Sequence, residues 1–304
     1  MKKVLVISTQ VEAPQTSDRL AIIDLVADTI RSDEIDVQTT LFEDLFFSIK
    51  AGSPSVYDTR NDVILDTFDL VYIKNWGQIP EPARALDRWL RSEGIQVITQ
   101  ETENLPPQYK LSEGFALAIE GVPYPETAFT HDPARLSEAI KHAGFEYPLV
   151  VKSIEGRVGK DNYLVESEDQ LRSLLPKMRG QSFMAQGFVP NDGDHRVLIM
   201  GYKPVLSFHR STDEDTHLNN TSQGGGAALT DLSDYSDAVL EDCVKAARAT
   251  KRDIAGVDVM FNSETGQHYI LEANTSPQIV SGAYLEEKSQ AFKSYIHNLL
   301  ESEG

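Results

Sequence analysis

The segment that most constrains the fold is residues 254–279, IAGVDVMFNSETGQHYILEANTSPQI. Two apolar runs, Ala255–Phe261 and Gln267–Ala273, flank a polar turn, which predicts two short strands. Asp258 lies in the first run, and Glu272 and Asn274 lie at the end of the second. Residues two apart on a strand share a face, so Glu272 and Asn274 point the same way. If the strands pair as a hairpin, Asp258 joins them from the neighbouring strand.

Two carboxylates and an amide oxygen on one sheet face form a set of hard oxygen ligands. Mg²⁺ prefers such ligands and commonly shares them with waters and the phosphates of a nucleotide. The alternative is a polar sheet face turned to water. We predict a magnesium site, because these acids interrupt runs that are otherwise apolar.

The composition predicts a soluble, multidomain protein. A length of 304 residues suits two or three domains. No apolar run approaches the ~20 residues that span a bilayer. The start, MKKVLVIST, predicts a first strand rather than a secretory signal, since an acid and a proline follow at once. The single cysteine, Cys243, excludes an intrachain disulfide and fits a cytoplasmic location.

The net charge of −19 argues against nucleic acid as a partner, because phosphate backbones require clusters of Lys and Arg. We therefore expect neither a nucleic-acid nor a membrane partner. Any anionic ligand must be held by a few locally placed cations.

Residues 1–105 alternate strands and helices. The predicted strands are Val4–Ile7, Val37–Leu41, Leu70–Ile73 and Ile95–Ile98, and the predicted helices run from Ser17 or Asp18 to Ile30 and over Glu81–Glu93. Such alternation predicts an open, largely parallel sheet with helices on both sides. The segments Ser8–Gln10 and Lys74–Gly77 follow strands, and each either connects elements or contacts a substrate.

A second chemistry-bearing segment is YPLVVKSIEGRVGKDNYLVES, residues 147–167. The predicted strand Leu149–Val151 leads to Lys152, and a loop with Gly156 and Gly159 precedes the strand Tyr163–Val165. Backbone N–H groups of a glycine-bearing loop can close over phosphates, and a lysine adds a point charge to them. The alternative is an ordinary hairpin with a solvated lysine.

The remaining sequence predicts further helices and strands. The helices are Tyr109–Glu120, Leu136–Ala143, one from Asp234 or Ser236 to Lys251, and Leu285–Leu300, and the strands are Phe183–Ala185, His195–Met200 and Val205–Phe208.

Six motifs in order along residues 106–280 resemble the ATP-grasp superfamily, and most closely its RimK-like ligases. They are PLVVKSIEGxxG, QxFV, DHRV, NNTSQGG, AGVDV and LEANTSP. The resemblance implies an α/β (α+β) fold in which an ATP-grasp unit follows a small parallel-sheet, Rossmann-like domain. It divides the chain into an N-terminal domain at 1–105, a small subdomain at 106–185 with the glycine loop, and a large subdomain at 186–304 with the metal site.

The resemblance also implies roles for individual residues. Lys110 and Lys152 contact the nucleotide phosphates, under the loop that holds Gly156 and Gly159. The hinge whose backbone reads the adenine comprises Gln186, Phe188 and Val189. The ligands of two Mg²⁺ ions, for which Mn²⁺ is an alternative, are Asp258, Glu272 and Asn274. The residues that steady the γ-phosphate and the acyl phosphate are Arg196, Arg210 and Asn220.

The implied function is an ATP-dependent carboxylate–amine ligase that acts on an amino acid or peptide through an acyl phosphate and releases ADP and phosphate. Many such ligases form homo-oligomers. His209, beside Arg210, is either the base for the amine's proton or a surface histidine. Asp161 stands where the glycine loop of the family has its last glycine. Two alternatives stay open: a phosphotransferase on the same fold, and a nucleotide-binding regulatory protein without catalysis, which Asp161 favours.

Overall fold

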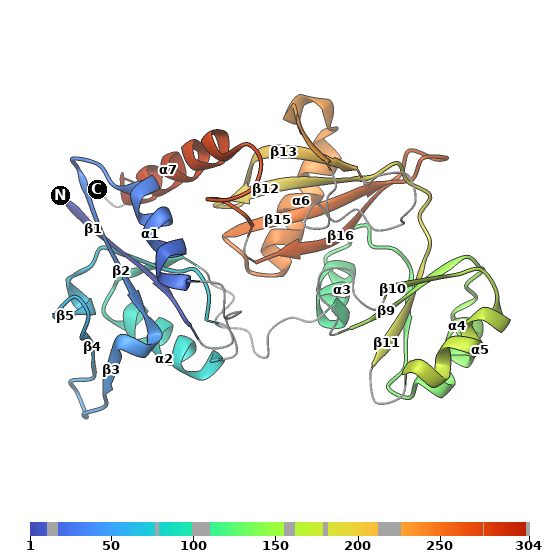
Figure 1. Ribbon diagram of the computed structural model, residues 1–304, viewed down its shortest axis with the longest axis horizontal. Coiled ribbons are helices and arrows are strands. Elements are labelled where there is room, and N and C mark those ends of the chain that lie inside the picture. Colours follow the sequence, from blue (N-terminus) through green and yellow to red (C-terminus); the bar gives the residue numbers. More distant parts are fainter. Residues whose placement is uncertain are drawn as a thin grey trace.

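Four β-sheets and their covering helices are arranged along the long axis of the molecule (Figure 1). This arrangement is that of a computed structural model, which describes residues 1–10, 18–76, 79–98, 110–154, 162–178, 182–211, 226–275 and 277–301. The N-terminal sheet lies at one end, a small antiparallel sheet lies at the other, and a large antiparallel sheet lies between them.

The N-terminal sheet has four parallel strands in the order β2-β1-β6-β7. Their bounds are β1 Lys2–Ser8, β2 Ile35–Leu41, β6 Leu70–Ile73 and β7 Gln96–Ile98. In β1 the four residues Val4–Ile7 are fully buried, because helices cover both faces of a parallel sheet. The predicted alternation of strands and helices in this region is confirmed.

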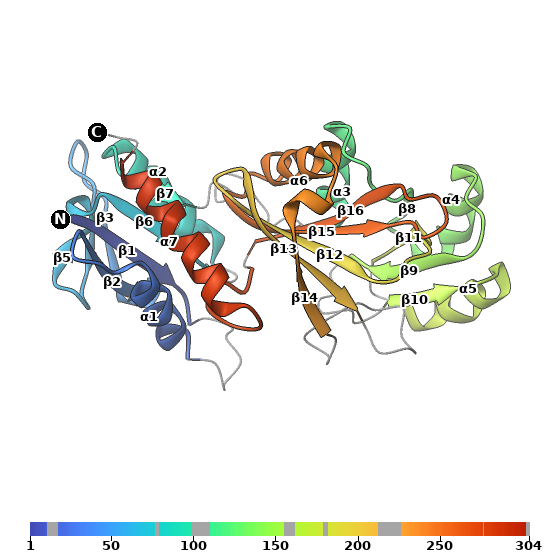
Figure 2. The same ribbon diagram turned by 90° about the horizontal axis from the view of Figure 1, so that it is seen from above.

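Two helices from opposite ends of the chain cover one face of this sheet (Figure 2). Helix α1 (Arg19–Ile30) begins after Asp18, whose carboxylate accepts a hydrogen bond from the Ala21 N–H. Helix α7 (Leu285–Glu301) lies next to α1, and Phe292 packs against Tyr72 of β6 with 5.8 Å between the ring centroids. The last helix therefore completes the core of the first sheet, although the sequence placed it with the large subdomain.

The opposite face is covered by helix α2 (Pro80–Ser92) and by a three-stranded antiparallel sheet that the sequence did not predict. The strands of this sheet are β3 Leu45–Ser48, β4 Ser55–Asp58 and β5 Val63–Ile64. They are short, and only Val56 and Leu45 among them are buried apolar residues, so they carry little of the alternation that identifies a strand.

The small antiparallel sheet has the order β10-β9-β11-β8 and packs against two helices. Its elements are β8 Thr127–Phe129, α4 Leu136–Ala143, β9 Leu149–Ser153, β10 Asn162–Val165, α5 Glu168–Leu174 and β11 Phe183–Gly187. Lys152 and Gln186 both lie within strands of this sheet, one residue beyond the ends that the sequence predicted.

The large sheet has the order β14-β13-β12-β15-β16 and carries most of the predicted chemistry. Its strands are β12 Asp194–Met200, β13 Lys203–Ser211, β14 Gly226–Thr230, β15 Ile254–Phe261 and β16 His268–Asn274. Helices α3 (Lys110–Ile119) and α6 (Asp237–Ala249) contribute to the core on one face. Cys243 is fully buried there.

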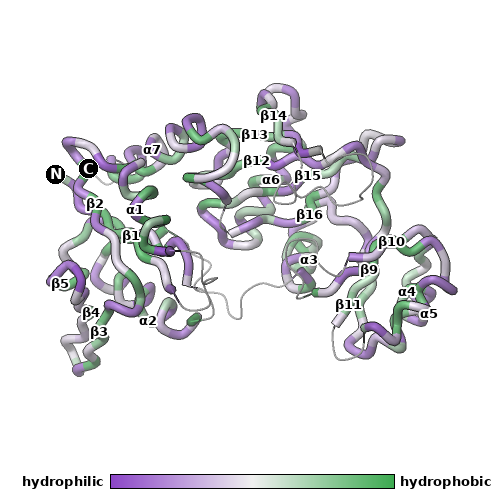
Figure 3. Tube along the Cα trace, in the orientation of Figure 1, coloured by the Kyte–Doolittle hydropathy of each residue, from purple (hydrophilic) through white to green (hydrophobic). Residues whose placement is uncertain are grey.

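The hydropathy of the chain follows this layering: the interior strands are apolar, and the helices alternate between polar and apolar faces (Figure 3). Among the described residues, no helix combines the length and the apolar composition needed to cross a bilayer.

Candidate functional site

The β15–β16 hairpin brings together the three predicted metal ligands. Asp258 lies directly opposite Glu272 in the register, and Asn274 lies opposite Gly256. The Asn274 amide nitrogen is 3.2 Å from Asp258 Oδ2 and 3.0 Å from Glu272 Oε1, so all three side chains share one face. The register shifts just beyond the Asp258–Glu272 pair, and such bulges are frequent beside active sites because they redirect side chains. The predicted hairpin and its shared face are confirmed.

Two arginines from the adjoining strands neutralise Asp258. Arg196 faces Asp258 in the register and donates from Nε to Oδ1 at 2.7 Å and from Nη2 to Oδ2 at 2.8 Å. Arg210 Nη2 lies 3.0 Å from the same Oδ2. Arg210 also donates to Asp194, which shares its position in the register across β12 and β13. Two carboxylates and two guanidinium groups thus form one network on the sheet face that α6 does not cover.

Charge governs the protonation of the two acids in this network. Burial would raise the pKa of Asp258, but Arg196 and Arg210 hold it below its usual value. Burial and repulsion from Asp258 raise the pKa of Asp194 to about 7 despite its contact with Arg210. Asp194 Oδ1 and Arg210 Nε are buried and have no hydrogen-bond partner among the residues that the structure describes, so each could still form one hydrogen bond to a ligand.

The residues present fit a divalent cation with hard-oxygen preference. Two carboxylates and an amide are the ligand types that Mg²⁺ takes. Asn274 turns its amide nitrogen to both acids, and a half-turn of that amide presents its oxygen to the same point. In the described part of the chain no three His, Cys, Asp or Glu side chains gather as a metal cluster, and the set at Asp258 reaches three only through the amide.

Lys152 lies on the small sheet, where Gln186 holds it. Its Nζ donates to Gln186 Oε1 at 2.7 Å, and Gln186 in turn donates from Nε2 to Thr127 Oγ1 at 3.0 Å. Burial, together with the charge of Lys110, lowers the pKa of Lys152 to about 8, whereas Glu272 and Glu113 oppose the shift. The charges of Lys110 and Glu272 therefore both act on Lys152, although the three residues come from three different elements.

The predicted hinge follows β11, and its backbone is already hydrogen-bonded. The Phe188 N–H donates to Pro148 O at 3.3 Å, and the Val189 carbonyl accepts from Asn191 Nδ2 at 2.8 Å. The adenine-reading role assigned to Gln186, Phe188 and Val189 stays a prediction. A carbonyl oxygen has two lone pairs, so the Val189 carbonyl keeps one for a base.

Several predicted residues lie elsewhere. Gly156, Gly159 and Asn220 lie outside the described residues. His209 is on the opposite sheet face from Arg210, with its ring 4.7 Å from that of His195, because neighbouring residues on a strand point to opposite sides. The interpretation of His209 as the base is therefore wrong for this arrangement.

The residues that follow β1 form hydrogen bonds within the N-terminal domain. Thr9 Oγ1 donates to Glu43 Oε1 at 2.8 Å, and the Gln10 N–H donates to the same oxygen at 2.9 Å. At the end of β6, burial and the nearby Arg19 lower the pKa of Lys74 to about 8. A contact of either segment with substrate stays a prediction.

Asp194 was not predicted as a site residue, although it lies two residues before Arg196 in the motif DHRV. The period of two that placed Glu272 with Asn274 also places Asp194 with Arg196 on one face, and it could have identified this acid. Lys288 was missed as well: it is buried in the first turn of α7, donates to the Ser281 carbonyl and is close enough to Arg196 for their charges to interact.

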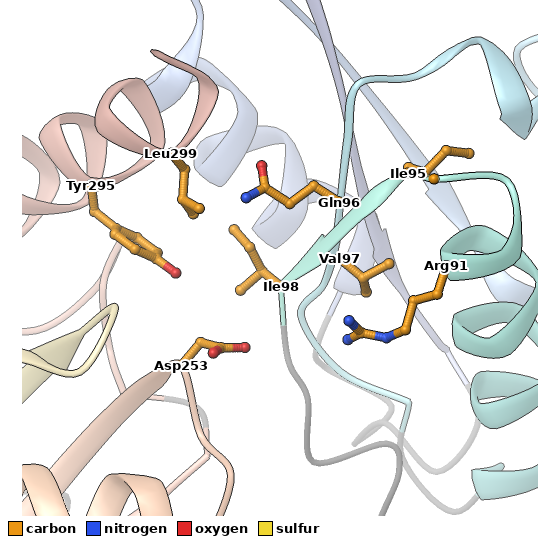
Figure 4. A pocket seen from close by; sticks show the side chains of 9 residues that line it. Arg91, Ile95, Gln96, Val97, Ile98, Asp253, Tyr295 and Leu299 are labelled. Atoms are coloured by element: carbon orange, nitrogen blue, oxygen red, sulfur yellow. The ribbon is translucent and has the colours of Figure 1, made fainter. Parts of the chain in front are cut away.

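A cavity of about 420 Å³ lies away from this network, between β7 and α7 (Figure 4). Gln96 and Ile98 from the sheet edge face Tyr295 and Leu299 from the helix, and Asp253 closes one end. None of the predicted site residues that the structure describes lines this cavity, which lies between the N-terminal sheet and the large sheet.

The family of the chain follows from a comparison with known protein families. The family model described as RimK-like ATP-grasp domain matches residues 109–289, which is more than half of the chain. The chain belongs to the RimK-like ATP-grasp family. The resemblance that the six motifs indicated is therefore confirmed, and so is the expected fold, a parallel N-terminal sheet followed by the antiparallel sheets of the ATP-grasp unit.

Similar proteins in this family carry ligase names. A probable alpha-L-glutamate ligase of Cellvibrio japonicus (strain Ueda107) is 28% identical over 236 residues, which cover 76% of this chain and 76% of that protein. A second one, from Alkalilimnicola ehrlichii (strain ATCC BAA-1101 / DSM 17681 / MLHE-1), is 30% identical over 217 residues, which cover 70% of each protein. The solved structure of the ATP-grasp ligase PsnB complexed with minimal precursor, Mg and ADP has the same fold, with a TM-score of 0.69 and 16% identity over 97% of this chain and 96% of that chain.

Proposed function

We propose that this RimK-like protein is an ATP-dependent carboxylate–amine ligase that forms an amide bond through an acyl phosphate. The family and the ligase names of its relatives support the class of reaction. By the same names, L-glutamate is the first amino acid to test as substrate. ATP and Mg²⁺ are the proposed cofactors, since a protein of the same fold is complexed with Mg and ADP.

The single observation that carries the proposal is the arrangement around Asp258. Asp258 is paired with Arg196 and Arg210 and lies opposite Glu272, whose charge reaches Lys152 on the small sheet. A site for a nucleotide phosphate and a second, carboxylate-bearing substrate needs oxygen ligands for a cation and several positive groups. Both are present within one region of a protein whose net charge is −19.

Asp258, Glu272 and Asn274 would hold up to two Mg²⁺ ions, which when bound would neutralise phosphate charge. Arg196 and Arg210 would then be free of part of their pairing with Asp258. Their guanidinium groups suit bidentate contact with phosphate and carboxylate oxygens. We assign them to hold the γ-phosphate and the reacting carboxylate in line, with Lys152 and Lys110 on the remaining phosphates.

The proposed reaction has two steps. A carboxylate oxygen of the substrate attacks the γ-phosphorus of ATP, the bond to the ADP oxygen breaks, and an acyl phosphate and ADP result. The amine then attacks the acyl carbon, the bond between that carbon and the phosphate oxygen breaks, and an amide, phosphate and a proton leave. The protein mainly positions the reactants and neutralises developing charge.

The test is ADP and phosphate release by the purified protein with MgATP and pools of amino acids and peptides that contain L-glutamate. The proposal expects release of both products only when a carboxylate and an amine are present together. ADP release without an amine and without free phosphate would instead identify a phosphotransferase. Binding of an ATP analogue without ADP release on any pool would identify a regulatory protein. Substitution Glu272→Gln should abolish turnover, and unchanged turnover would reject the metal assignment.

A further inference from the structure

We propose that Glu113 and Arg252 are positioning residues that fix the metal-binding end of β16. This inference rests on the proposed function, because it assigns the two residues to the cation site of that reaction. Neither residue belongs to the sheet that carries the proposed ligands: Glu113 is in α3, and Arg252 lies just after α6.

The two side chains hold the backbone of Ala273, the residue between Glu272 and Asn274. The Ala273 N–H donates to Glu113 Oε1 at 2.5 Å, and Arg252 Nη1 donates to the Ala273 carbonyl oxygen. Arg252 Nη1 also lies 3.2 Å from Glu113 Oε2, which closes a ring of three partners. One acidic and one basic side chain thus form hydrogen bonds with both backbone groups of Ala273.

The position of β16 in the sheet explains why its backbone needs these two side chains. Among the described strands β16 is an outer one, so no strand in that part of the chain pairs with the backbone groups on its free side. Buried backbone groups without partners are costly. Ala273 is 1% exposed, and Glu113 and Arg252 are 7% and 4% exposed, so water cannot substitute for the two side chains. Together they replace the missing strand at this one position.

The consequence is a fixed orientation of the proposed ligands. The Ala273 side chain points into the core beneath α3 and α6, which sends Glu272 and Asn274 to the opposite face. If the outward backbone of Ala273 were free to rotate, both ligands would lose their common direction. Groups that orient metal ligands from outside the coordination shell typically change metal affinity or activity by about 10- to 100-fold when removed.

Helix α3 links this strand to the nucleotide contacts. Lys110 and Glu113 are three residues apart, so they share a helix face, and both influence the charge of Lys152. A purely structural role for the pair is the competing explanation. Asp242 of α6 provides a matched comparison, because it holds the other end of β16. Its Oδ2 lies 2.9 Å from His268 Nε2.

The experiment compares Glu113→Ala, Glu113→Gln and Asp242→Ala with the natural protein. Titration calorimetry measures binding of a non-hydrolysable ATP analogue with and without Mg²⁺, and chemical denaturation measures the free energy of unfolding. We expect Glu113→Ala to weaken the Mg²⁺-dependent part of binding by about 10- to 100-fold. Glu113→Gln keeps an acceptor for the Ala273 N–H and should recover most of this loss. Asp242→Ala should change Mg²⁺ dependence less than about twofold, even where its loss of stability is similar.

The inference is overturned if Glu113→Ala leaves Mg²⁺ dependence unchanged, or if Asp242→Ala weakens it equally. Equal effects of Glu113→Ala and Glu113→Gln would show that the charge of Glu113 matters rather than its hold on Ala273, which also overturns it. If Glu113→Ala does not fold, Glu113→Asp, whose shorter side chain withdraws the acceptor from the Ala273 N–H, takes its place in the comparison with Glu113→Gln. Failure of the proposed function is separate: the natural protein would bind the Mg²⁺–analogue complex but release no ADP on any substrate pool. Absence of that binding would overturn both.

Discussion

At the scale of single residues, Asp258 and Glu272 have different surroundings although they lie side by side. Asp258 is 4% exposed and accepts from two arginines, whereas Glu272 is partly exposed and accepts only from Asn274 among the described residues. Both are proposed metal ligands, so activity alone cannot separate their roles. Their effects on stability can.

Substitution Asp258→Asn should lower the free energy of unfolding by about 3 kcal/mol in the absence of metal. It removes the carboxylate that pairs with Arg196 and leaves Arg210 paired with Asp194 instead of both acids, and breaking a buried ion pair on one side is costly. Glu272→Gln should change stability by less than about 1 kcal/mol, because a partly exposed carboxylate with one amide partner loses little. Urea denaturation of the two variants measures the difference. Equal losses would contradict the network as described.

The affinity for ATP should fall as the pH rises above about 8, because burial lowers the pKa of Lys152 to about 8 in the free protein. The sign follows from linkage: phosphates favour the protonated lysine, so nucleotide binding takes up a proton wherever the free lysine has lost one. Below pH 8 the lysine is already charged, so its contribution to the affinity is level. Above it the affinity falls by up to about tenfold per pH unit.

Calorimetry of ATP-analogue binding between pH 7 and pH 9.5 measures this effect. The matched control is Lys152→Met, in which binding is weaker at neutral pH and the slope above pH 8 is lost. If the slope persists in that variant, another group is responsible.

At the scale of elements, helix α3 packs closely because it has a glycine where a side chain would collide. A Cβ on Gly114 would lie 2.9 Å from Tyr124 Cε1, closer than real contacts. Substitution Gly114→Ala should therefore displace α3 or Tyr124 and lower the free energy of unfolding by about 1–3 kcal/mol, the usual range for overpacking. The double variant with Tyr124→Leu should lose less than the sum of the single variants. An additive double variant would show that the two residues do not collide.

Elements were predicted well where periodicity is strong. The sequence identified the parallel strands, the hairpin of β15 and β16 and all the larger helices, because each carries a clear apolar period. The strands β3 to β5 were missed, since they are short and half-exposed. The sequence also failed to show that α3 packs on the large sheet and that α7 packs on Tyr72, because a helical period reveals an apolar face but not its partner.

The site was predictable in part for a similar reason. A period of two in one hairpin placed Asp258, Glu272 and Asn274 together. The pairing of Asp258 with Arg196 and Arg210 depends on the order of three strands, which the sequence did not give. The hydrogen bond from the Ala273 N–H to Glu113 joins residues that are 160 positions apart, and no local sequence pattern predicts such a contact.

At the scale of the whole molecule, α7 joins the last residues to the first sheet. Phe292 is fully buried against the N-terminal core, so Phe292→Ala should lower the free energy of unfolding by about 3–5 kcal/mol. Leu285→Ala, at a 47% exposed position on the same helix, is the control and should change it by less than about 1 kcal/mol. Guanidinium denaturation followed by circular dichroism measures both. A small effect of Phe292→Ala would mean that α7 does not complete that core.

The two arginines and the oxygen ligands lie on β12, β13, β15 and β16 of the large sheet, and Lys110 begins α3, which packs on that sheet. Lys152 lies on β9 of the small sheet. This placement of the charged groups suits a reaction in which a carboxylate oxygen of the substrate attacks the terminal phosphate of the nucleotide. That transfer is the central claim of the account.

The most direct measurement of that claim is the fate of the carboxyl oxygen. The carboxylate substrate that supports ADP release is labelled with ¹⁸O in its carboxyl group, and the phosphate released during turnover is analysed by mass spectrometry. Because the amine expels phosphate together with the former carboxyl oxygen, the account predicts one labelled oxygen in each phosphate. Unlabelled phosphate, formed together with the amide, would contradict it.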